Sequence, residues 1–224
     1  MIKLHPWTLD PEEAVRLQNS LCQRLVLTWD DRPVRTVAGV DVDFPGEQAR
    51  AAIVVLAYPD LVYLATAVAD TPLVFPYIPG LLAFREGPAV LAAWEKLRVK
   101  PDLLFFDAQG IAHPRSIGMA AQMGLWLERP AIGVAKSRLY GDHAEVGLKA
   151  GDWTELRDEH DPRQVIGAVL RTREEVRPLY VSPGHLIDLE HALEFVLRCC
   201  RGYRLPEPSR LAHQASRQPD QFTA

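Results

Sequence analysis

Three acidic residues, far apart in the chain, lie in or beside segments with the pattern of regular secondary structure. Asp41 lies within the alternating segment 34–44, and Asp107 directly follows the apolar run 103–106. An acid inside a strand that faces other protein layers costs free energy unless it is paired or binds a cation. Carboxylates that meet at one end of a sheet offer the hard oxygen ligands that Mg²⁺ and Mn²⁺ prefer, and Glu86 could supply a third. Such a site is suited to phosphodiester hydrolysis.

Each of these acids also has an ordinary structural explanation. Asp41 could bond a backbone amide or an arginine, and Asp107 could cap a turn. Asp43 shares the strand face with Asp41 and could compete for the metal. Asp43 lies nearer the strand end, so we expect it either to contact the metal ligands without binding the metal or to lie at the surface. On spacing alone, the structural explanations are the more common ones.

The segments around the acids predict a mixed α/β fold. Asp10 and Pro11 predict the start of a helix. The segment 34–44 predicts a strand with Asp41 and Asp43 on one face. Two further apolar runs, separated by Pro59 and Asp60, complete a three-stranded antiparallel meander. These two runs are the predicted strands at 51–58 and 61–68. Further strands are predicted at 103–106, 131–135, 165–170 and 179–181, and helices at 87–98, 117–127 and 189–199.

Two of these strands should bring the acids together. The continuous apolar run 103–106 is typical of a strand buried on both faces of a parallel sheet. Right-handed crossover connections make this strand a plausible neighbour of the strand 34–44. Asp41 and Asp107 would then meet at the carboxyl ends of adjacent strands.

Length and composition indicate a soluble globular protein. The 224 residues are 48% hydrophobic and 24% charged, as in ordinary folded domains. We expect residues 1–213 to form a single catalytic domain and the polar segment 214–224 to be a flexible tail. With no signal-peptide pattern and no apolar run of about 20 residues, we expect a cytoplasmic protein, no membrane contact and a monomer. The cysteines should be reduced core residues: Cys22, Cys199 and Cys200.

The charge balance counts against a protein that coats nucleic acid independently of sequence. The net charge is −4 and the isoelectric point is near 6.0, whereas phosphate binding usually requires a basic surplus. The segment 163–217 is locally basic, with nine arginines and no lysine against six acidic residues. Net charge therefore does not decide the substrate.

Six segments occur in an order that covers nearly the whole chain. They are VAGVDVDFPG (37–46), FPYIPGLLAFREGP (75–88), FDAQGIAHPR (106–115), IGVAKSRLYG (132–141), VSPGH (181–185) and PEPSRLAH (206–213). Together they resemble the endonuclease V family. The resemblance implies a ribonuclease H-like α/β fold: a mixed central sheet, with three antiparallel strands followed by parallel strands, flanked by helices.

The resemblance also implies roles for individual residues. Asp41, Glu86 and Asp107 fall on the catalytic carboxylates of the family, and His213 falls on its C-terminal catalytic histidine. Asp41 and Asp107 are the expected ligands of Mg²⁺, for which Mn²⁺ can substitute; Glu86 could bind the metal through water. His213 could contact the metal, the attacking water or the phosphate.

Further residues could contact phosphates. Lys136, at the end of a strand, could neutralise the scissile phosphate or could simply be a solvated strand end. Ser137 and Arg138 could hold neighbouring phosphates. His185 could bind a phosphate at the start of the last helix or could cap that helix.

The function that the resemblance implies is DNA repair. The enzyme would recognise deaminated purines, chiefly hypoxanthine in deoxyinosine, and hydrolyse the second phosphodiester bond on the 3′ side. The products would carry 3′-hydroxyl and 5′-phosphate ends. Inosine-containing RNA is a second candidate substrate. Two rivals are another ribonuclease H-like nuclease, acting on RNA, hybrids or branched DNA, and a binding protein without catalysis, which the carboxylates argue against because they repel phosphates unless a cation intervenes.

The motif PYIPG predicts a projecting apolar edge. Pro76 and Pro79 stiffen the backbone around Tyr77 and Ile78. Tyr77, Ile78 and Pro79 could therefore act as a wedge at a base step; the alternative is a buried turn with Tyr77 in the core.

A flipped base would need a pocket beside this wedge. The resemblance implies that the loop after Asp107 holds the base. At Ala108 the family commonly has glycine, so the methyl group could crowd a base or require a negative φ. The expected lining residues are Gly80, Leu82, Ala108, Gln109, Gly110 and His113.

Overall fold

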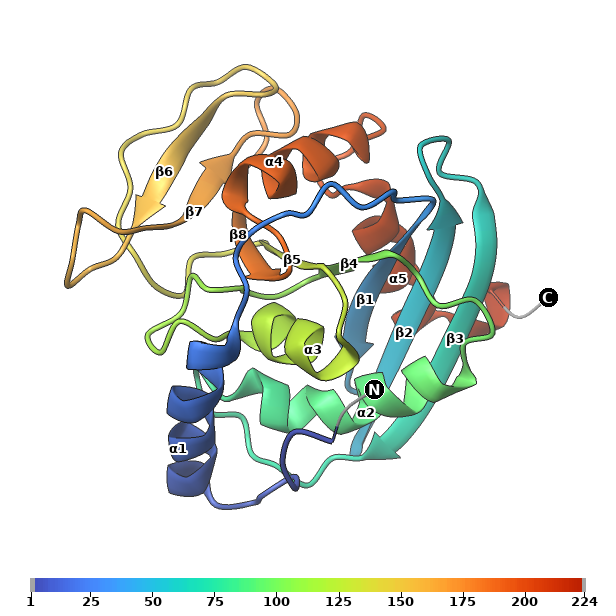
Figure 1. The fold of residues 1–224 in the computed structure, drawn as a ribbon. Coiled ribbons are helices and arrows are strands. Elements are labelled where there is room, and N and C mark those ends of the chain that lie inside the picture. Colours follow the sequence, from blue (N-terminus) through green and yellow to red (C-terminus); the bar gives the residue numbers. More distant parts are fainter. Residues whose placement is uncertain (1–2, 223–224) are drawn as a thin grey trace.

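Eight strands form one mixed sheet in the part of the chain that the structure, a computed structural model, describes, residues 3–222 (Figure 1). Their order is β3-β2-β1-β4-β5-β8-β7-β6. The mixed α/β class predicted from the sequence is confirmed. The strands are β1 (Thr36–Asp43), β2 (Gln48–Ala57), β3 (Tyr63–Pro72), β4 (Leu103–Phe106), β5 (Ala131–Ala135), β6 (Trp153–Arg157), β7 (Val165–Leu170) and β8 (Leu179–His185).

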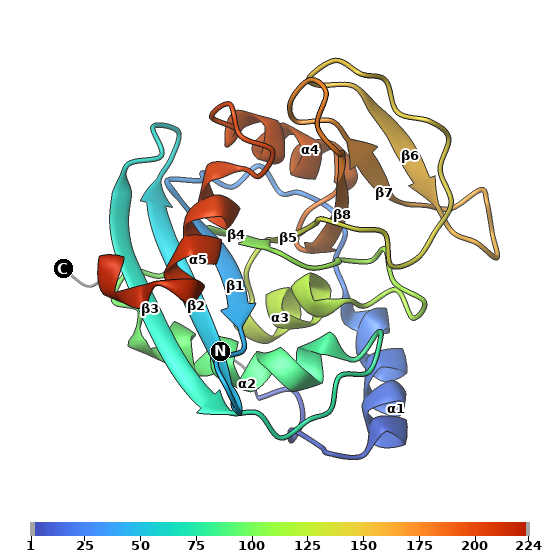
Figure 2. The same cartoon turned by 180° about the vertical axis from the view of Figure 1, so that it is seen from behind.

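Helices cover both faces of this sheet. The helices α2 and α3 pack against one face, and α4 and α5 pack against the other (Figures 1 and 2). The helix α1 lies beside α2 and α3, where Ala14 and Leu21 are buried. The α-helices are α1 (Pro11–Leu21), α2 (Leu82–Lys96), α3 (Met119–Leu127), α4 (Leu189–Arg198) and α5 (Glu207–Arg217), and short 3₁₀ helices span Cys22–Arg24 and Pro219–Gln221.

The strand pairing explains how distant acids become neighbours. The strands β1, β2 and β3 form the expected antiparallel meander. The strand β4 pairs with β1 in parallel, with Val40 opposite Phe106, and β5 pairs with β4 in parallel. Beyond β5 the sheet returns to antiparallel pairing through β8, β7 and β6. The residues that follow Val40 and Phe106 are the two predicted metal ligands.

The predicted start of α2 was wrong. Gly87 and Pro88 are not at its first turn, because the helix begins at Leu82 and Pro88 lies inside it. An interior proline removes one hydrogen bond and costs about 3 kcal/mol. Burial of the face that includes Ala83, Phe84 and Ala89 offsets that cost. Glu86 therefore lies within a rigid helix instead of in the loop before it.

The C-terminal tail was also predicted wrongly. Residues 214–217 form the last turn of α5, and Ala215 and Ser216 are fully buried. This helix lies close to β1 because Gly39 has no side chain: a Cβ there would lie 1.9 Å from the carbonyl oxygen of Pro208. Figure 2 shows α5 lying across β1 and β2. The helix therefore delivers its own side chains to the end of β1.

The cysteine prediction holds for one residue. All three cysteines are free, but only Cys199 is buried, whereas Cys22 and Cys200 are partly exposed.

Within residues 3–222, no helix has the length and apolar character needed to cross a bilayer.

Candidate active site

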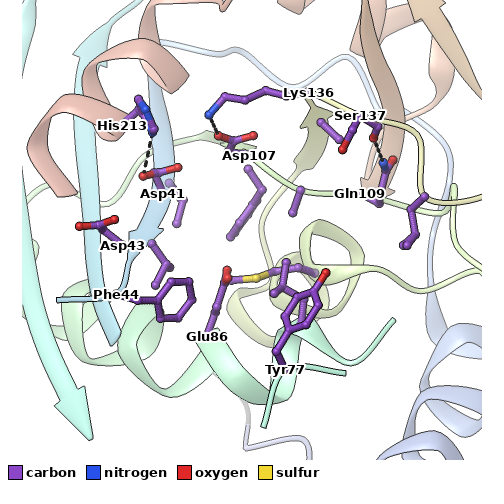
Figure 3. A pocket seen from close by; sticks show the side chains of 18 of the residues that line it. Asp41, Asp43, Phe44, Tyr77, Glu86, Asp107, Gln109, Lys136, Ser137 and His213 are labelled. Atoms are coloured by element: carbon purple, nitrogen blue, oxygen red, sulfur yellow. Dashed lines mark hydrogen bonds and ion pairs between the residues drawn. The ribbon is translucent and has the colours of Figure 1, made fainter. Parts of the chain in front are cut away.

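Two aspartates and a histidine meet at the carboxyl ends of β1 and β4. Asp41, Asp107 and His213 each offer one ligand atom, and these atoms all lie within 4.8 Å of one another. Asp41 comes from β1, Asp107 directly follows β4 and His213 comes from α5. Figure 3 shows the three side chains pointing toward one another at one end of a cleft. The structure thus brings the two expected metal ligands together with the predicted catalytic histidine.

Asp41 is held by the last turns of α5. The Ser216 hydroxyl donates a hydrogen bond of 2.6 Å to Asp41 Oδ2, and His213 Nδ1 lies 3.3 Å from the same oxygen. These contacts differ from the backbone-amide or arginine partners considered as alternatives. Burial raises the pKa of the Asp41 carboxyl, Ser216 opposes that shift, and the negative charge of Asp107 adds to it. The ionised form of Asp41 therefore gains from a bound cation.

Asp107 forms an ion pair with Lys136, which directly follows β5 (Figure 3). Lys136 is therefore not a solvated strand end. The Lys136 backbone is fixed as well, because Arg204 Nη2 donates to its carbonyl oxygen at 2.8 Å. On the other side, Gln109 Nε2 donates to the Ser137 carbonyl oxygen at 2.9 Å. The segment that carries the ammonium group thus has little freedom to move away from the carboxylates.

Glu86 faces the same cleft from α2 (Figure 3). Its side chain is nearly buried, with 9% of the residue exposed. Burial raises the pKa of Glu86 to about 8, and the charges of Asp41 and Asp107 add to the shift. Glu86 is not one of the three residues whose ligand atoms lie within 4.8 Å of one another. It fits a role in which it meets a cation through water.

The cleft has a volume of about 570 Å³ and a mixed rim. Phe44 and Tyr77 line it with apolar surface, and Arg138 and Arg217 line it with positive charge. Asp43 also lines the cleft but is outside the three-residue cluster, in keeping with its expected secondary position. Ser137 and Arg138 are exposed. Cations at the rim and carboxylates at the centre suit a phosphate backbone bound across a metal site.

A second cavity of about 100 Å³ adjoins the cleft. It lies between the PYIPG loop, the start of α2 and the loop after β4. The methyl group of Ala108 lines both cavities, and Ala108 is not among the described residues with positive φ, so alanine fits there without backbone strain. The cavity gathers five of the six residues expected around a flipped base: Gly80, Leu82, Ala108, Gln109 and His113.

The prediction for Gly110 was wrong. Gly110 does not line the cavity, because its backbone N–H donates to the Ser182 hydroxyl at 2.8 Å. A Cβ at this position would lie 2.0 Å from the Pro183 carbonyl oxygen. The glycine is therefore needed for close packing against β8.

The PYIPG loop does project from the surface. Tyr77 is 69% exposed, and Pro79 is exposed. Ile78 is partly buried against the cluster that contains Ala14, Phe75 and Phe84. The alternative of a buried turn with Tyr77 in the core is therefore wrong.

Both explanations offered for His185 were wrong. His185 is buried in β8, where its Nδ1 accepts a hydrogen bond of 3.3 Å from the backbone N–H of Val26. Burial lowers the pKa of His185 to about 4, so the ring is neutral. The cap of α4 is Asp188, which accepts from the His191 backbone N–H. His185 therefore anchors the segment after α1.

Two residues of the site were not found from the sequence. Ser216 lies three residues after His213, so a helix through 207–217 would place both on one face, and the stripe of small residues there is the signal that could have revealed it. Arg204 has no such signal, because its three acceptors are backbone carbonyls of Lys136, Arg177 and Pro178.

Comparisons with known proteins agree with this geometry. The family model described as Endonuclease V matches residues 19–214. The endonuclease V of Methanothrix thermoacetophila is 51% identical over 210 residues, which cover 94% of this chain and 92% of that protein.

Solved structures give the same match. The endonuclease V of Streptomyces avermitilis has a TM-score of 0.88 and 38% identity, covering 96% of this chain and 95% of that one. An endonuclease V of Ciona intestinalis, solved with a 23mer DNA that contains an inosine followed by a ribo-adenosine, has a TM-score of 0.83 and 26% identity. It covers 94% of this chain and 96% of that one. The expected ribonuclease H-like fold is thereby confirmed.

Proposed function

The chain belongs to the endonuclease V family, and we propose that it is a cation-dependent endonuclease that cuts DNA near deaminated purines. The observation that carries the proposal is the convergence of Asp41, Asp107 and His213 in a cleft that also contains Glu86. A group of buried or partly buried acids would repel a phosphate unless a cation were bound among them. The same acids are the ligand types that Mg²⁺ and Mn²⁺ prefer.

Asp41 and Asp107 are the proposed ligands of Mg²⁺, with Mn²⁺ able to substitute. The residues fit such an ion, because burial and mutual repulsion raise the pKa of Asp41 and of Glu86, and added positive charge would relieve both effects. When bound, the ion would polarise the phosphate and make a water molecule more acidic. Glu86 would accept a hydrogen bond from water at the edge of the cluster.

The remaining polar groups have separate tasks. The His213 nitrogen that does not face Asp41 can give or take a proton at the attacking water or the leaving oxygen. Lys136 can neutralise a phosphate oxygen once the ion shares Asp107. Ser137 and Arg138, both exposed beside the cleft, can hold neighbouring phosphates.

The cavity next to the cleft is the proposed site for hypoxanthine. Tyr77 and Pro79 would occupy the space that the base leaves in the stack. The structure of the Ciona intestinalis relative with inosine-containing DNA supports this choice of substrate.

The cut would fall away from the lesion. The base cavity and the carboxylate cleft are separate but share Tyr77, Leu82, Ala108, Gln109, Met119 and Leu139 along their border. A base in one cavity therefore places a different nucleotide of the same strand over the acids. We propose cleavage at the second phosphodiester bond on the 3′ side, with 3′-hydroxyl and 5′-phosphate products.

The test uses four end-labelled strands: DNA and RNA, each with and without one inosine. With Mg²⁺ we expect one cut in inosine-containing DNA, at the second bond 3′ to the lesion, and none in the presence of EDTA. Ligation of the downstream product would verify its 5′-phosphate. Preferential cutting of inosine RNA would reassign the substrate, and equal cutting of all four strands would contradict lesion recognition.

A further inference from the structure

One backbone oxygen in the PYIPG loop accepts hydrogen bonds from three side chains. The carbonyl oxygen of Gly80 lies 3.0 Å from Gln18 Nε2, 2.9 Å from His113 Nε2 and 2.8 Å from Arg115 Nη2. Gly80 has a φ of +81°, a conformation that favours glycine. A Cβ on Gly80 would also lie 2.7 Å from Arg115 Nη2. The loop is thus held at a point where only glycine fits.

The donors in this network are fixed by their other contacts. Arg115 Nε donates to Gln18 Oε1 at 2.6 Å, so the amide nitrogen of Gln18 must face Gly80. The Arg115 backbone N–H donates to His113 Nδ1 at 3.1 Å, so the ring carries its proton on Nε2. Burial lowers the pKa of His113 to about 4. The histidine is therefore a neutral donor, and both of its nitrogens are already used within the protein.

Two of the three side chains are shielded from solvent, whereas Arg115 is partly exposed. Gln18 is 1% exposed and His113 is 2% exposed. No acidic side chain pairs with Arg115 among residues 3–222, so its guanidinium group depends on the oxygens of Gly80 and Gln18. Loss of either oxygen would remove a charge-assisted hydrogen bond from the partly buried guanidinium group. These three side chains join α1 to the two loops that enclose the base cavity.

We propose that Gln18, His113 and Arg115 are positioning residues that hold the wedge and the base cavity in their binding shape before DNA arrives. This inference rests on the proposed function, because it assigns the cavity to a flipped base. The network fixes the turn between Tyr77 and Leu82, in which Tyr77 and Pro79 are exposed. A prebuilt pocket saves the ordering cost at the moment of binding. His113 lines the cavity, but both of its ring nitrogens bond to the protein, so it supports the pocket wall and is not a hydrogen-bond partner of the base.

The decisive variant is Gln18→Met, which keeps the side-chain length but removes the hydrogen bonds of Gln18 with Gly80, Arg115 and Ile117. We expect KM for an inosine-containing duplex to rise about tenfold, with kcat changed less than about twofold. The rise should be smaller for single-stranded inosine DNA, where no partner strand must be replaced by the wedge.

Gln122→Met is the matched control. Gln122 is another fully buried glutamine, in α3, and its amide contacts His5 Nε2 at 3.1 Å. The variant loses a buried amide of the same kind without touching Gly80, so KM should stay within about twofold of the unchanged protein.

A second variant separates the acceptor contact of Gln18 from its donor contacts. Gln18→Glu keeps an oxygen for Arg115 but has no donor for the carbonyl oxygens of Gly80 and Ile117 at neutral pH. We expect the same rise in KM as in Gln18→Met. This variant also serves if the methionine side chain prevents folding.

Hydrogen exchange in the absence of DNA gives an independent measure. Amides in 76–83 should exchange faster in Gln18→Met and Gln18→Glu than in the unchanged protein, and Gln122→Met should match the unchanged protein in this segment. Folded Gln18 variants with unchanged exchange and unchanged KM would overturn the positioning role. If the unchanged protein does not cut inosine strands, the proposed function fails, and the exchange rates still decide whether the network holds the loop.

Discussion

The catalytic cleft and the base cavity share a border, but their polar groups differ in charge and in how fully they are hydrogen-bonded. In the cleft, Asp41 and Glu86 have raised pKa values because they are buried close to other acids. In the cavity wall, His113 is neutral and uses both ring nitrogens in hydrogen bonds. The acids of the cleft therefore gain from added positive charge, whereas both ring nitrogens of His113 have hydrogen-bond partners without any ligand.

The two regions therefore reach their active forms by different interactions. The cleft is stabilised by a cation, so its affinity and its stability should depend on pH and on metal. The cavity is stabilised by hydrogen bonds between neutral or permanently charged groups, so its shape should be independent of both. Substitutions in the two regions should then differ in what they change: cation-dependent chemistry in the cleft and recognition in the cavity.

The largest effect should follow removal of a metal ligand. We expect Asp41→Ala and Asp107→Ala to fold but to cut inosine DNA at least about a thousandfold more slowly, because the cation and its stabilisation of phosphate charge are lost. Single-turnover cutting and calorimetric titration with Mn²⁺ measure both losses.

The control for these variants is Asp70→Ala. Asp70 is also a sheet aspartate, but it lies on β3, pairs with Arg50 of β2 and does not line the cleft. Wild-type cutting by either cleft variant would exclude the proposed site.

The second effect should come from Glu86→Gln. Cutting should fall about tenfold to a hundredfold, as for a group that supports a metal through water. Without metal, the raised pKa of Glu86 means that its contribution to stability is fully present below about pH 4.5 and is lost as pH rises through about 8. The unfolding free energy of the unchanged protein should therefore fall relative to Glu86→Gln over this range, by at most about 1.4 kcal/mol per pH unit.

Urea denaturation in EDTA between pH 4.5 and 9 measures this difference. Glu95→Gln, on the exposed side of the same helix, should run parallel to the unchanged protein. If the unfolding free energy of Glu86→Gln also ran parallel to that of the unchanged protein, the charge of Glu86 would not destabilise the fold. The contrast between cleft and cavity would then have no electrostatic basis.

A third, smaller effect should appear on the cavity side. Tyr77→Ala should lower kcat/KM for an inosine duplex by about tenfold, because the ring no longer replaces the lost base stack. Single-stranded inosine DNA should be affected less, and the pH profile and metal affinity should not change. Equal losses on duplex and single strands would contradict the wedge. Tyr63→Ala, which removes an exposed tyrosine on β3 far from the cleft, is the control.

The sequence predicted those parts of the fold that local patterns determine. The alternating segment around Asp41 and the apolar run before Asp107 gave the two central strands, and parallel pairing then brought the acids together. Helix starts were harder to predict. Pro88 has the local signature of a first turn, and only the burial of Ala83 and Phe84 extends α2 toward the N-terminus.

The rest of the site depends on long-range packing. The helix α5 has little large apolar surface, so its pattern resembles a polar tail until Gly39 and the small side chains of the helix are placed together. Arg204 is recognised by backbone carbonyls alone, which no sequence pattern encodes. Gly110 satisfied the family motif but serves packing against β8.

The smallest expected effect concerns Ser216, which lies in the part of α5 that was predicted to be a flexible tail. Its hydroxyl favours the ionised form of Asp41, so Ser216→Ala should raise the pKa of this carboxyl further. We expect kcat to fall about threefold to tenfold at neutral pH and the acidic limb of the rate profile to move to higher pH. Ser209→Ala is the control, because Ser209 is buried in the same helix and its hydroxyl has no hydrogen-bond partner among residues 3–222. Identical pH profiles for the two variants would mean that α5 supports Asp41 by packing alone, whereas a shifted acidic limb in Ser216→Ala only would show that the helix tunes the charge of the cleft.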